Sequence, residues 1–217
     1  YKLASHSLTN IDLLKACSKL NIDIILSTGM AEVEEIDTAV ELLKSNNLSL
    51  LHCVSSYPTP INECNLQMIN FLKDRYKITV GYSGHELGFL PSLAAVASGA
   101  EIIERHITID KKMEGFDHKI SLEPQELEEM VSNIRDIENC FSLENKKVSS
   151  TEMITRNKYH VSMISKRLIK KGELLEKEMI TYKNPGTGIP PKYEKKYLNK
   201  KILLDIEIDT LITNEMF

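Results

Sequence analysis

The stretches LSLLHC (residues 48–53) and ITVGY (residues 78–82) decide the fold class of this chain. Each is a short apolar run, and the two begin about 30 residues apart, which is the length of one strand plus one helix. Similar runs occupy residues 1–4, 24–26 and 101–106, and apolar residues recur at helical spacing between them. Strand and helix therefore alternate, which predicts a parallel sheet with right-handed crossover connections.

Two architectures fit this alternation: a closed (β/α) barrel and an open, doubly wound sheet. No G-x-G-x-x-G motif follows the first runs, which argues against a dinucleotide-binding fold. Polar residues gather after the expected strands, where barrel enzymes carry their chemistry. We therefore expect an α/β fold of the (β/α)8 TIM-barrel type over residues 1–141.

The number of runs predicts only part of such a barrel. A closed barrel requires eight strand–helix units and about 250 residues. The five runs predict about five units, so residues 1–141 are expected to form the C-terminal portion of the barrel, with the N-terminal part missing. The chain also begins at Tyr1 rather than at methionine. We expect that residues 1–217 alone do not turn over a substrate.

The composition of the chain changes after residue 141. The segment SLENKKVSSTEMIT (residues 142–155) is polar and lacks periodicity, so residues 142–156 are predicted to be a linker. Residues 157–217 contain short β-like runs, broken by turn residues at 171–173 and 184–188. They predict a small β-rich domain.

The charge balance and the cysteines narrow the class of protein. The 217 residues include 27 Lys and Arg and 31 Asp and Glu, a net charge of −4, which is unlike the basic surfaces that bind nucleic acid without sequence preference. No apolar run approaches the roughly 18 residues that a membrane span requires. The four cysteines are irregularly spaced and form no C-x-x-C motif, which favours reduced thiols and a cytoplasmic protein.

Two histidines follow neighbouring expected strands. His85 comes two residues after Ser83, and His106 two residues after Glu104, so the period of a strand keeps each pair on one face. Adjacent strands lie about 5 Å apart, so both imidazoles can share one divalent cation and leave positions open for water and substrate. The alternative is a pair of hydrogen-bonded core histidines, which is the commoner role for two such residues.

Hydroxyl groups and one lysine predict an acidic substrate. The segment STG (residues 27–29) lies between a strand and a helix, where backbone N–H groups and hydroxyls can hold an anion, although simple helix capping explains it equally well. Ser5 and Ser83 occupy comparable strand ends. Lys2 can supply a compact positive charge, while a single lysine at a sheet edge is by default only solvated.

Two loop residues are further candidates. Tyr57 begins the stiff loop YPTP (residues 57–60), whose prolines fix the backbone, so its hydroxyl can face a ligand. Packing in a rigid turn accounts for this tyrosine equally well. Asp117 lies on a loop beyond His106 and can bind a sugar hydroxyl, whereas most loop aspartates are only solvated.

Five segments stand in order along the chain: ILSTGMA (25–31), LLHCVSSYPTP (50–60), GYS-x-H (81–85), IIERHIT (102–108) and NPGTGI (184–189). Together they resemble the sialic acid synthase family, which includes N-acetylneuraminate, legionaminic acid and pseudaminic acid synthases. No single segment suffices, but their order over essentially the whole chain is specific.

The resemblance implies a fold, an activity and an assembly. It implies a TIM barrel followed by a small antifreeze-like domain (SAF, β-clip). It also implies a metal-dependent synthase that condenses phosphoenolpyruvate with an open-chain N-acetylated sugar aldehyde, such as N-acetylmannosamine, to a nonulosonic acid and phosphate. The implied assembly is a homodimer in which each small domain covers the barrel of the other chain.

The resemblance also implies roles for individual residues. His85 and His106 would hold the divalent metal, Mn²⁺ or Mg²⁺. The residues implied for the phosphoenolpyruvate site are Lys2, Ser5, Ser27, Thr28, Ser55 and Ser83. Tyr57 and Asp117 match positions that contact the sugar. With the two histidines, Lys2 and Tyr57 are the catalytic candidates.

Three positions depart from the family pattern. Gly84 stands where Asp is usual and Ser7 where Glu is usual, and Asn184 stands where an arginine commonly reaches the active site of the other subunit. Lys183 is adjacent to Asn184 but lacks the planar guanidinium fork. These departures motivate an alternative, a non-catalytic or altered-specificity homologue that acts as a binding or assembly module. A barrel lyase or aldolase acting on phosphorylated sugars is a third hypothesis, and it leaves the C-terminal domain unexplained.

Overall fold

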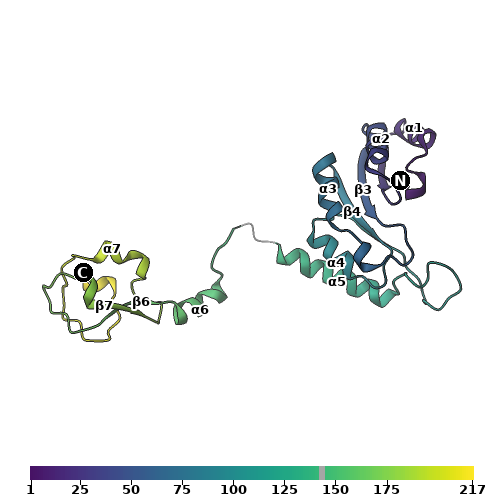
Figure 1. Cartoon of the computed structure of the whole chain (residues 1–217). Coiled ribbons are helices and arrows are strands. Elements are labelled where there is room, and N and C mark those ends of the chain that lie inside the picture. The colour runs from purple at the N-terminus through teal and green to yellow at the C-terminus, as the bar shows by residue number, and fades with distance from the viewer. Residues whose placement is uncertain (142–144) are drawn as a thin grey trace. The chain divides into compact units, whose positions relative to one another are not determined.

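The computed structural model describes residues 1–141 and 145–217, which form two compact units divided between residues 144 and 145 (Figure 1). Each unit has a hydrophobic core of its own. Within the described residues, no helix combines the length and the apolar character needed to cross a membrane.

A five-stranded parallel sheet forms the centre of the first unit. Its strands run in sequence order: β1 (Lys2–Leu3), β2 (Asp23–Ser27), β3 (Asn47–Cys53), β4 (Thr79–Gly84) and β5 (Ile103–Arg105). The helices of this unit are α1 (Ile11–Ser18), α2 (Val33–Leu43), α3 (Gln67–Tyr76), α4 (Leu90–Ala97) and α5 (Pro124–Cys140), with 3-10 turns at Ser5–Ser7 and Ile61–Glu63. Each strand overlaps one of the five predicted runs, so the parallel α/β architecture is confirmed.

The sheet is strongly curled. Among the described strands, β1 and β5 form its two edges, yet Lys2 Nζ lies 3.1 Å from Glu104 Oε1. Five flat strands at a spacing of about 4.8 Å would separate these edges by roughly 19 Å, which is farther than the two side chains can span. The inner face of the sheet is therefore concave.

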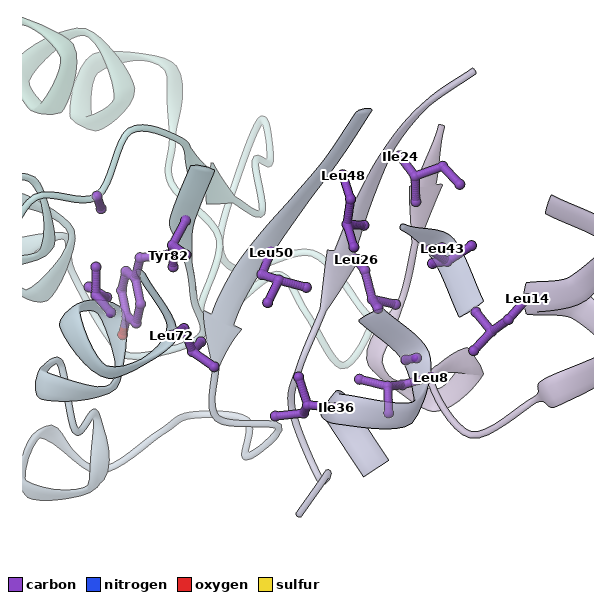
Figure 2. Packing of buried hydrophobic residues seen from close by; sticks show 14 of the residues in the cluster. Leu8, Leu14, Ile24, Leu26, Ile36, Leu43, Leu48, Leu50, Leu72 and Tyr82 are labelled. Atoms are coloured by element: carbon purple, nitrogen blue, oxygen red, sulfur yellow. The ribbon is translucent and has the colours of Figure 1, made fainter. Parts of the chain in front are cut away.

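The outer face of the sheet packs against the helices. Figure 2 shows Leu26, Leu48 and Leu50 from the strands in the same buried cluster as Ile36 and Leu43 from α2. Fully burying one such side chain stabilises the fold by roughly 1.5–3 kcal/mol, so this layer fixes which face of each strand points outward. The alternate residues then point inward, and the carboxyl ends of all five strands meet at one edge.

The second unit is built from short β pairings around its own core. Strands β6 (Ser162–Ser165) and β7 (Ile180–Lys183) pair antiparallel. The unit also contains α7 (Glu194–Tyr197) and 3-10 turns at Lys177–Met179, Pro191–Tyr193 and Asn214–Met216. Apolar side chains such as Met163, Ile169 and Ile206 fill the core. This agrees with the predicted β-rich character of the segment.

One helix of the second unit was not predicted. Helix α6 (Ser150–Tyr159) occupies about half of residues 142–156, which were expected to be an irregular linker. Its first turn is capped by Ser149 Oγ, which accepts a hydrogen bond from the Glu152 N–H at 3.0 Å. None of its residues is buried, so it carries no apolar stripe that a sequence pattern could show. Residues 142–144 of the predicted linker lie outside the described residues.

Candidate active site

A cavity of about 400 Å³ opens at the carboxyl ends of the strands of the first unit. Its lining residues are Lys2, Ala4, Ser5, His6, Ser27, Met30, Cys53, Ser55, Tyr57, Ser83, His85, Glu104, His106 and Asp117. Each of the five strands contributes at least one of them. The structure thus brings together every site residue predicted from the sequence except Thr28.

His85 and His106 lie beside each other in this cavity, with ring centroids 5.5 Å apart and ring planes at 62°. Burial lowers the pKa of His85 below its ordinary 6.5, so the neutral ring is favoured near pH 7. His85 Nδ1 lies 2.9 Å from the carbonyl oxygen of Val54, which can only accept. The proton therefore sits on Nδ1, and Nε2 keeps its lone pair. His106 Nδ1 lies 3.6 Å from Asp117 Oδ2.

Tyr57 stands against the two histidines. Its ring centroid lies 4.4 Å from that of His85 and 6.2 Å from that of His106. Burial raises the pKa of the Tyr57 hydroxyl above its ordinary value, so this group stays protonated at neutral pH and can donate a hydrogen bond. The side chain is half exposed, which leaves it open to a ligand.

The ends of β1, β2 and β3 form a cradle of hydroxyl, thiol and amide groups around Gly29. The Gly29 N–H donates to Ser5 Oγ at 3.1 Å, and Ser5 Oγ lies 3.2 Å from Cys53 Sγ. A Cβ at position 29 would meet Ser55 Oγ at 2.3 Å and Cys53 Sγ at 2.8 Å, so only glycine fits here. Small polar groups converge where an anion can be held by several donors.

The hydroxyl group of Ser27 lacks a hydrogen-bond partner among the described residues, which indicates that a ligand provides one. Its Oγ is buried and has no hydrogen-bond partner within the described part of the chain. Buried hydroxyl groups are normally satisfied, because an unmade bond costs roughly 1–3 kcal/mol. Since Ser27 lines the cavity, a bound polar ligand is the natural partner.

Thr28 is the one predicted site residue that does not line the cavity. Its side chain is buried, and Oγ1 donates to the carbonyl oxygen of Leu51 on β3 at 3.1 Å. Thr28 is absent from the lining of the cavity. Its hydroxyl joins two neighbouring strands instead.

Glu104 is a site residue for which no role was predicted. Its Oε1 accepts from Ser83 Oγ at 2.7 Å and lies 3.1 Å from Lys2 Nζ. The carboxylate therefore orients two of the predicted anion-binding groups. The period of β5, which places Glu104 and His106 on the same face, was the signal that pointed to it.

The two imidazoles fit a divalent cation as a partial ligand set. A metal-binding histidine usually donates from its second nitrogen to a carbonyl or carboxylate, and His85 does so to Val54. Across residues 1–141 and 145–217, no cluster of three or more His, Cys, Asp or Glu is arranged to bind a metal ion. A metal held by these two residues would keep several positions for water or substrate oxygens, as open catalytic sites do.

Several known proteins are similar to this chain in sequence and in fold. The chain is 44% identical over 217 residues to N,N'-diacetyllegionaminic acid synthase of Campylobacter jejuni, covering 98% of this chain and 65% of that protein. The crystal structure of N-acetylneuraminic acid synthetase from Leptospira borgpetersenii has a TM-score of 0.65 at 41% identity, covering 71% of this chain and 55% of that one. For spore coat polysaccharide biosynthesis protein E of Chromobacterium violaceum, the TM-score is 0.80 at 26% identity, covering 99% and 66%.

The chain spans slightly less than two thirds of the length of the curated relatives it matches. The NeuB family model matches residues 1–146, and the SAF domain model matches residues 161–217. The family resemblance of the five sequence segments is confirmed. The chain belongs to the NeuB family and carries a SAF domain in its second unit.

Proposed function

We propose that this chain forms the catalytic face of a synthase that condenses phosphoenolpyruvate with an open-chain N-acetylated sugar aldehyde. A carbon–carbon bond forms between the methylene carbon of phosphoenolpyruvate and the aldehyde carbon. Water then adds to the resulting cationic carbon, and phosphate leaves with the bridging oxygen to give a nonulosonic acid. The observation that carries this proposal is the meeting of two histidines and a set of anion-binding groups in one cavity.

The anionic groups of phosphoenolpyruvate fit the cradle and the lysine beside it. Ser5, Ser27 and Ser55 present short hydroxyl groups, and Ser27 Oγ has no partner within the described residues. Lys2 adds a positive charge that Glu104 holds in place. Fixed donors of this kind stabilise charge without having to reorganise during the reaction.

The sugar aldehyde fits the part of the cavity at Tyr57 and Asp117. The protonated Tyr57 hydroxyl can donate to a sugar oxygen, and the Asp117 carboxylate can accept from a sugar hydroxyl. These two groups would orient the acceptor against the histidines. The names of the relatives suggest two acceptors, one that yields N-acetylneuraminic acid and one that yields N,N'-diacetyllegionaminic acid.

His85 and His106 are the residues that would hold a divalent metal ion, Mn²⁺ or Mg²⁺. Imidazole nitrogen suits Mn²⁺ better than Mg²⁺, which demands oxygen ligands more strictly. When bound, such an ion polarises the aldehyde oxygen and stabilises negative charge on it. The neutral His85 ring, held by Val54, keeps its Nε2 available for this purpose.

The remaining features of the proposal concern the complete protein. We propose that its barrel has the (β/α)8 TIM-barrel form, that it acts in the cytoplasm and that it forms a homodimer in which SAF domains are exchanged. The 19% identical 3-deoxy-D-arabino-heptulosonate 7-phosphate synthase structure from Thermotoga maritima, with a TM-score of 0.55, supports the barrel fold alone.

Phosphate release by the product of the complete gene tests the proposed function. The assay contains phosphoenolpyruvate and either acceptor sugar, with EDTA or with added Mn²⁺. We expect phosphate release only when sugar and Mn²⁺ are both present. If the protein binds phosphoenolpyruvate but releases no phosphate in all of these conditions, the proposal is wrong and the protein is a non-catalytic homologue.

A further inference from the structure

A buried ion pair lies directly behind the two histidines. The Arg105 guanidinium contacts the Glu86 carboxylate through Nη1 and Oε1, and their side chains are only 2% and 0% exposed. Glu86 follows His85 in the chain, and Arg105 precedes His106. His85 and His106 line the cavity, whereas neither Glu86 nor Arg105 does, so the charged pair lies outside the cavity that the imidazoles face.

Further hydrogen bonds anchor both charged groups. Glu86 Oε2 accepts from the Tyr82 hydroxyl at 2.8 Å. Arg105 Nη2 donates to the backbone carbonyl of Glu86 at 2.9 Å, and Nη1 donates to Ser92 Oγ at 3.1 Å. The carbonyl oxygen of Ile120 lies 3.4 Å from Nη2. The pair therefore ties the end of β4 to β5, to α4 and to the segment before α5.

Gly84 leaves the space that this pair occupies. A Cβ at position 84 would meet Glu86 Oε1 at 2.8 Å, Oε2 at 2.9 Å and Arg105 Nη1 at 3.0 Å. Any side chain here would displace the carboxylate or the guanidinium. The buried ion pair therefore requires glycine at position 84.

A buried ion pair is a weak source of stability, because the loss of hydration offsets much of its attraction. It does fix geometry, since the planar guanidinium and the carboxylate accept few relative orientations. We propose that Glu86 and Arg105 are positioning residues that set the spacing and orientation of His85 and His106. This inference rests on the proposed function, because the metal site at His85 and His106 would depend on these two residues.

The test uses the product of the complete gene and the double variant Glu86→Gln/Arg105→Met. The introduced glutamine amide keeps an acceptor for the Tyr82 hydroxyl, and removing both charges leaves no unpaired ion. The matched control is Asp37→Asn/Arg75→Met, which removes an exposed ion pair of 2.6 Å between α2 and α3, remote from the cavity. Both variants and the wild type are compared by thermal unfolding, Mn²⁺ titration calorimetry, steady-state kinetics and crystallography.

We expect the Glu86→Gln/Arg105→Met variant to fold, to bind Mn²⁺ at least tenfold more weakly and to lose at least tenfold in kcat with little change in KM for phosphoenolpyruvate. The control should keep the wild-type Mn²⁺ affinity and kcat. If the double variant does not fold, Arg105→Lys takes its place, because lysine keeps the charge but lacks the planar guanidinium group. This variant should fold and should also bind Mn²⁺ at least tenfold more weakly than the wild type. Wild-type Mn²⁺ affinity and kcat in a folded variant overturn the proposal.

The crystal structures separate this proposal from the proposed function. If the wild type neither binds Mn²⁺ nor releases phosphate, the proposed function fails, and the ring positions then decide the present inference. Rings of His85 and His106 that shift in the double variant and stay fixed in the control support a positioning role. Rings at the wild-type spacing of 5.5 Å between centroids in both variants overturn it.

Discussion

Ser27 and Thr28 are neighbours at the end of β2, and their hydroxyl groups have different partners. Ser27 Oγ has none among the described residues, and Thr28 Oγ1 donates to Leu51. We expect Ser27→Ala to leave the free energy of unfolding nearly unchanged and to raise KM for phosphoenolpyruvate about tenfold, the effect of losing one charge-assisted hydrogen bond of roughly 1.5 kcal/mol.

Thr28→Val is the matched control for that change. It should cost about 1 kcal/mol in the free energy of unfolding, because the Oγ1 hydrogen bond is lost while the Thr28 backbone N–H still donates to the Leu51 carbonyl at 3.0 Å, and KM should stay near the wild-type value. Urea denaturation and initial-rate kinetics measure both quantities. An unchanged KM in Ser27→Ala, or a raised KM in Thr28→Val, would place the substrate elsewhere.

Most of the site residues could be predicted from the sequence, but their hydrogen bonds and ion pairs could not. His85 and His106 were predicted from their positions after neighbouring strands, because the period of a strand fixes the side from which each residue projects. The bond from Thr28 Oγ1 to the Leu51 carbonyl was not predicted, since it depends on the register of β2 against β3. The partnership of Glu86 with Arg105 was missed, because nothing in a local pattern joins two residues 19 positions apart.

At the scale of elements, β3 carries a histidine in the apolar layer of the sheet. His52 is buried, its Nε2 donates to the carbonyl of Cys64 at 2.8 Å, and burial lowers its pKa below the ordinary 6.5. The unfolded chain therefore takes up a proton below pH 6.5 that the folded chain resists. The free energy of unfolding should fall as pH decreases below about 6.5, by at most about 1.4 kcal/mol per pH unit for this residue.

His52→Gln tests that expectation, because glutamine can still donate to Cys64 and does not titrate. The variant should show a shallower loss of stability between pH 7 and pH 5 than the wild type, as measured by urea denaturation. His160→Gln, which changes an exposed histidine of the second unit, should keep the wild-type slope. Equal slopes in all three proteins would mean that His52 titrates normally in the folded state.

The elements themselves were predicted unevenly, for physical reasons. Strands β2, β3 and β4 were visible because each buries several apolar side chains, such as Leu48, Leu50 and Leu51 of β3. Strands β1 and β5 contain no buried residue, and the spacing of the repeat located them. Helix α6 was not visible, because none of its residues is buried and its formation depends on the local cap at Ser149. The closeness of β1 and β5 was invisible as well, since the curl of a sheet emerges from packing rather than from any one strand.

At the scale of the whole molecule, charge is divided unequally between the two units. Residues 1–144 contain 12 basic and 22 acidic side chains, a net charge of −10, and residues 145–217 contain 15 basic and 9 acidic, a net charge of +6. In the proposed homodimer, the second unit of one copy would cover the first unit of the other. Opposite net charges would assist this contact over distances up to the Debye length, about 10 Å at 0.1 M salt.

We therefore expect self-association of the complete protein to depend on salt. Raising NaCl from 0.05 M to 0.5 M should weaken the dimer at least tenfold, as measured by sedimentation equilibrium. Sucrose at matched osmolality should leave the association unchanged, because it does not screen charge. If the dimer is equally tight at both salt concentrations, apolar contacts rather than opposite charges stabilise it.

We propose that His85 and His106 bind one divalent cation at the carboxyl ends of β4 and β5. Pulsed electron paramagnetic resonance of the Mn²⁺-loaded complete protein measures this directly, through the coupling of the metal to imidazole ¹⁴N. We predict two coupled nitrogens in the wild type and in His160→Ala, and one in each of His85→Ala and His106→Ala. Spectra without nitrogen coupling, or spectra that keep both couplings in the His85 and His106 variants, would contradict the account.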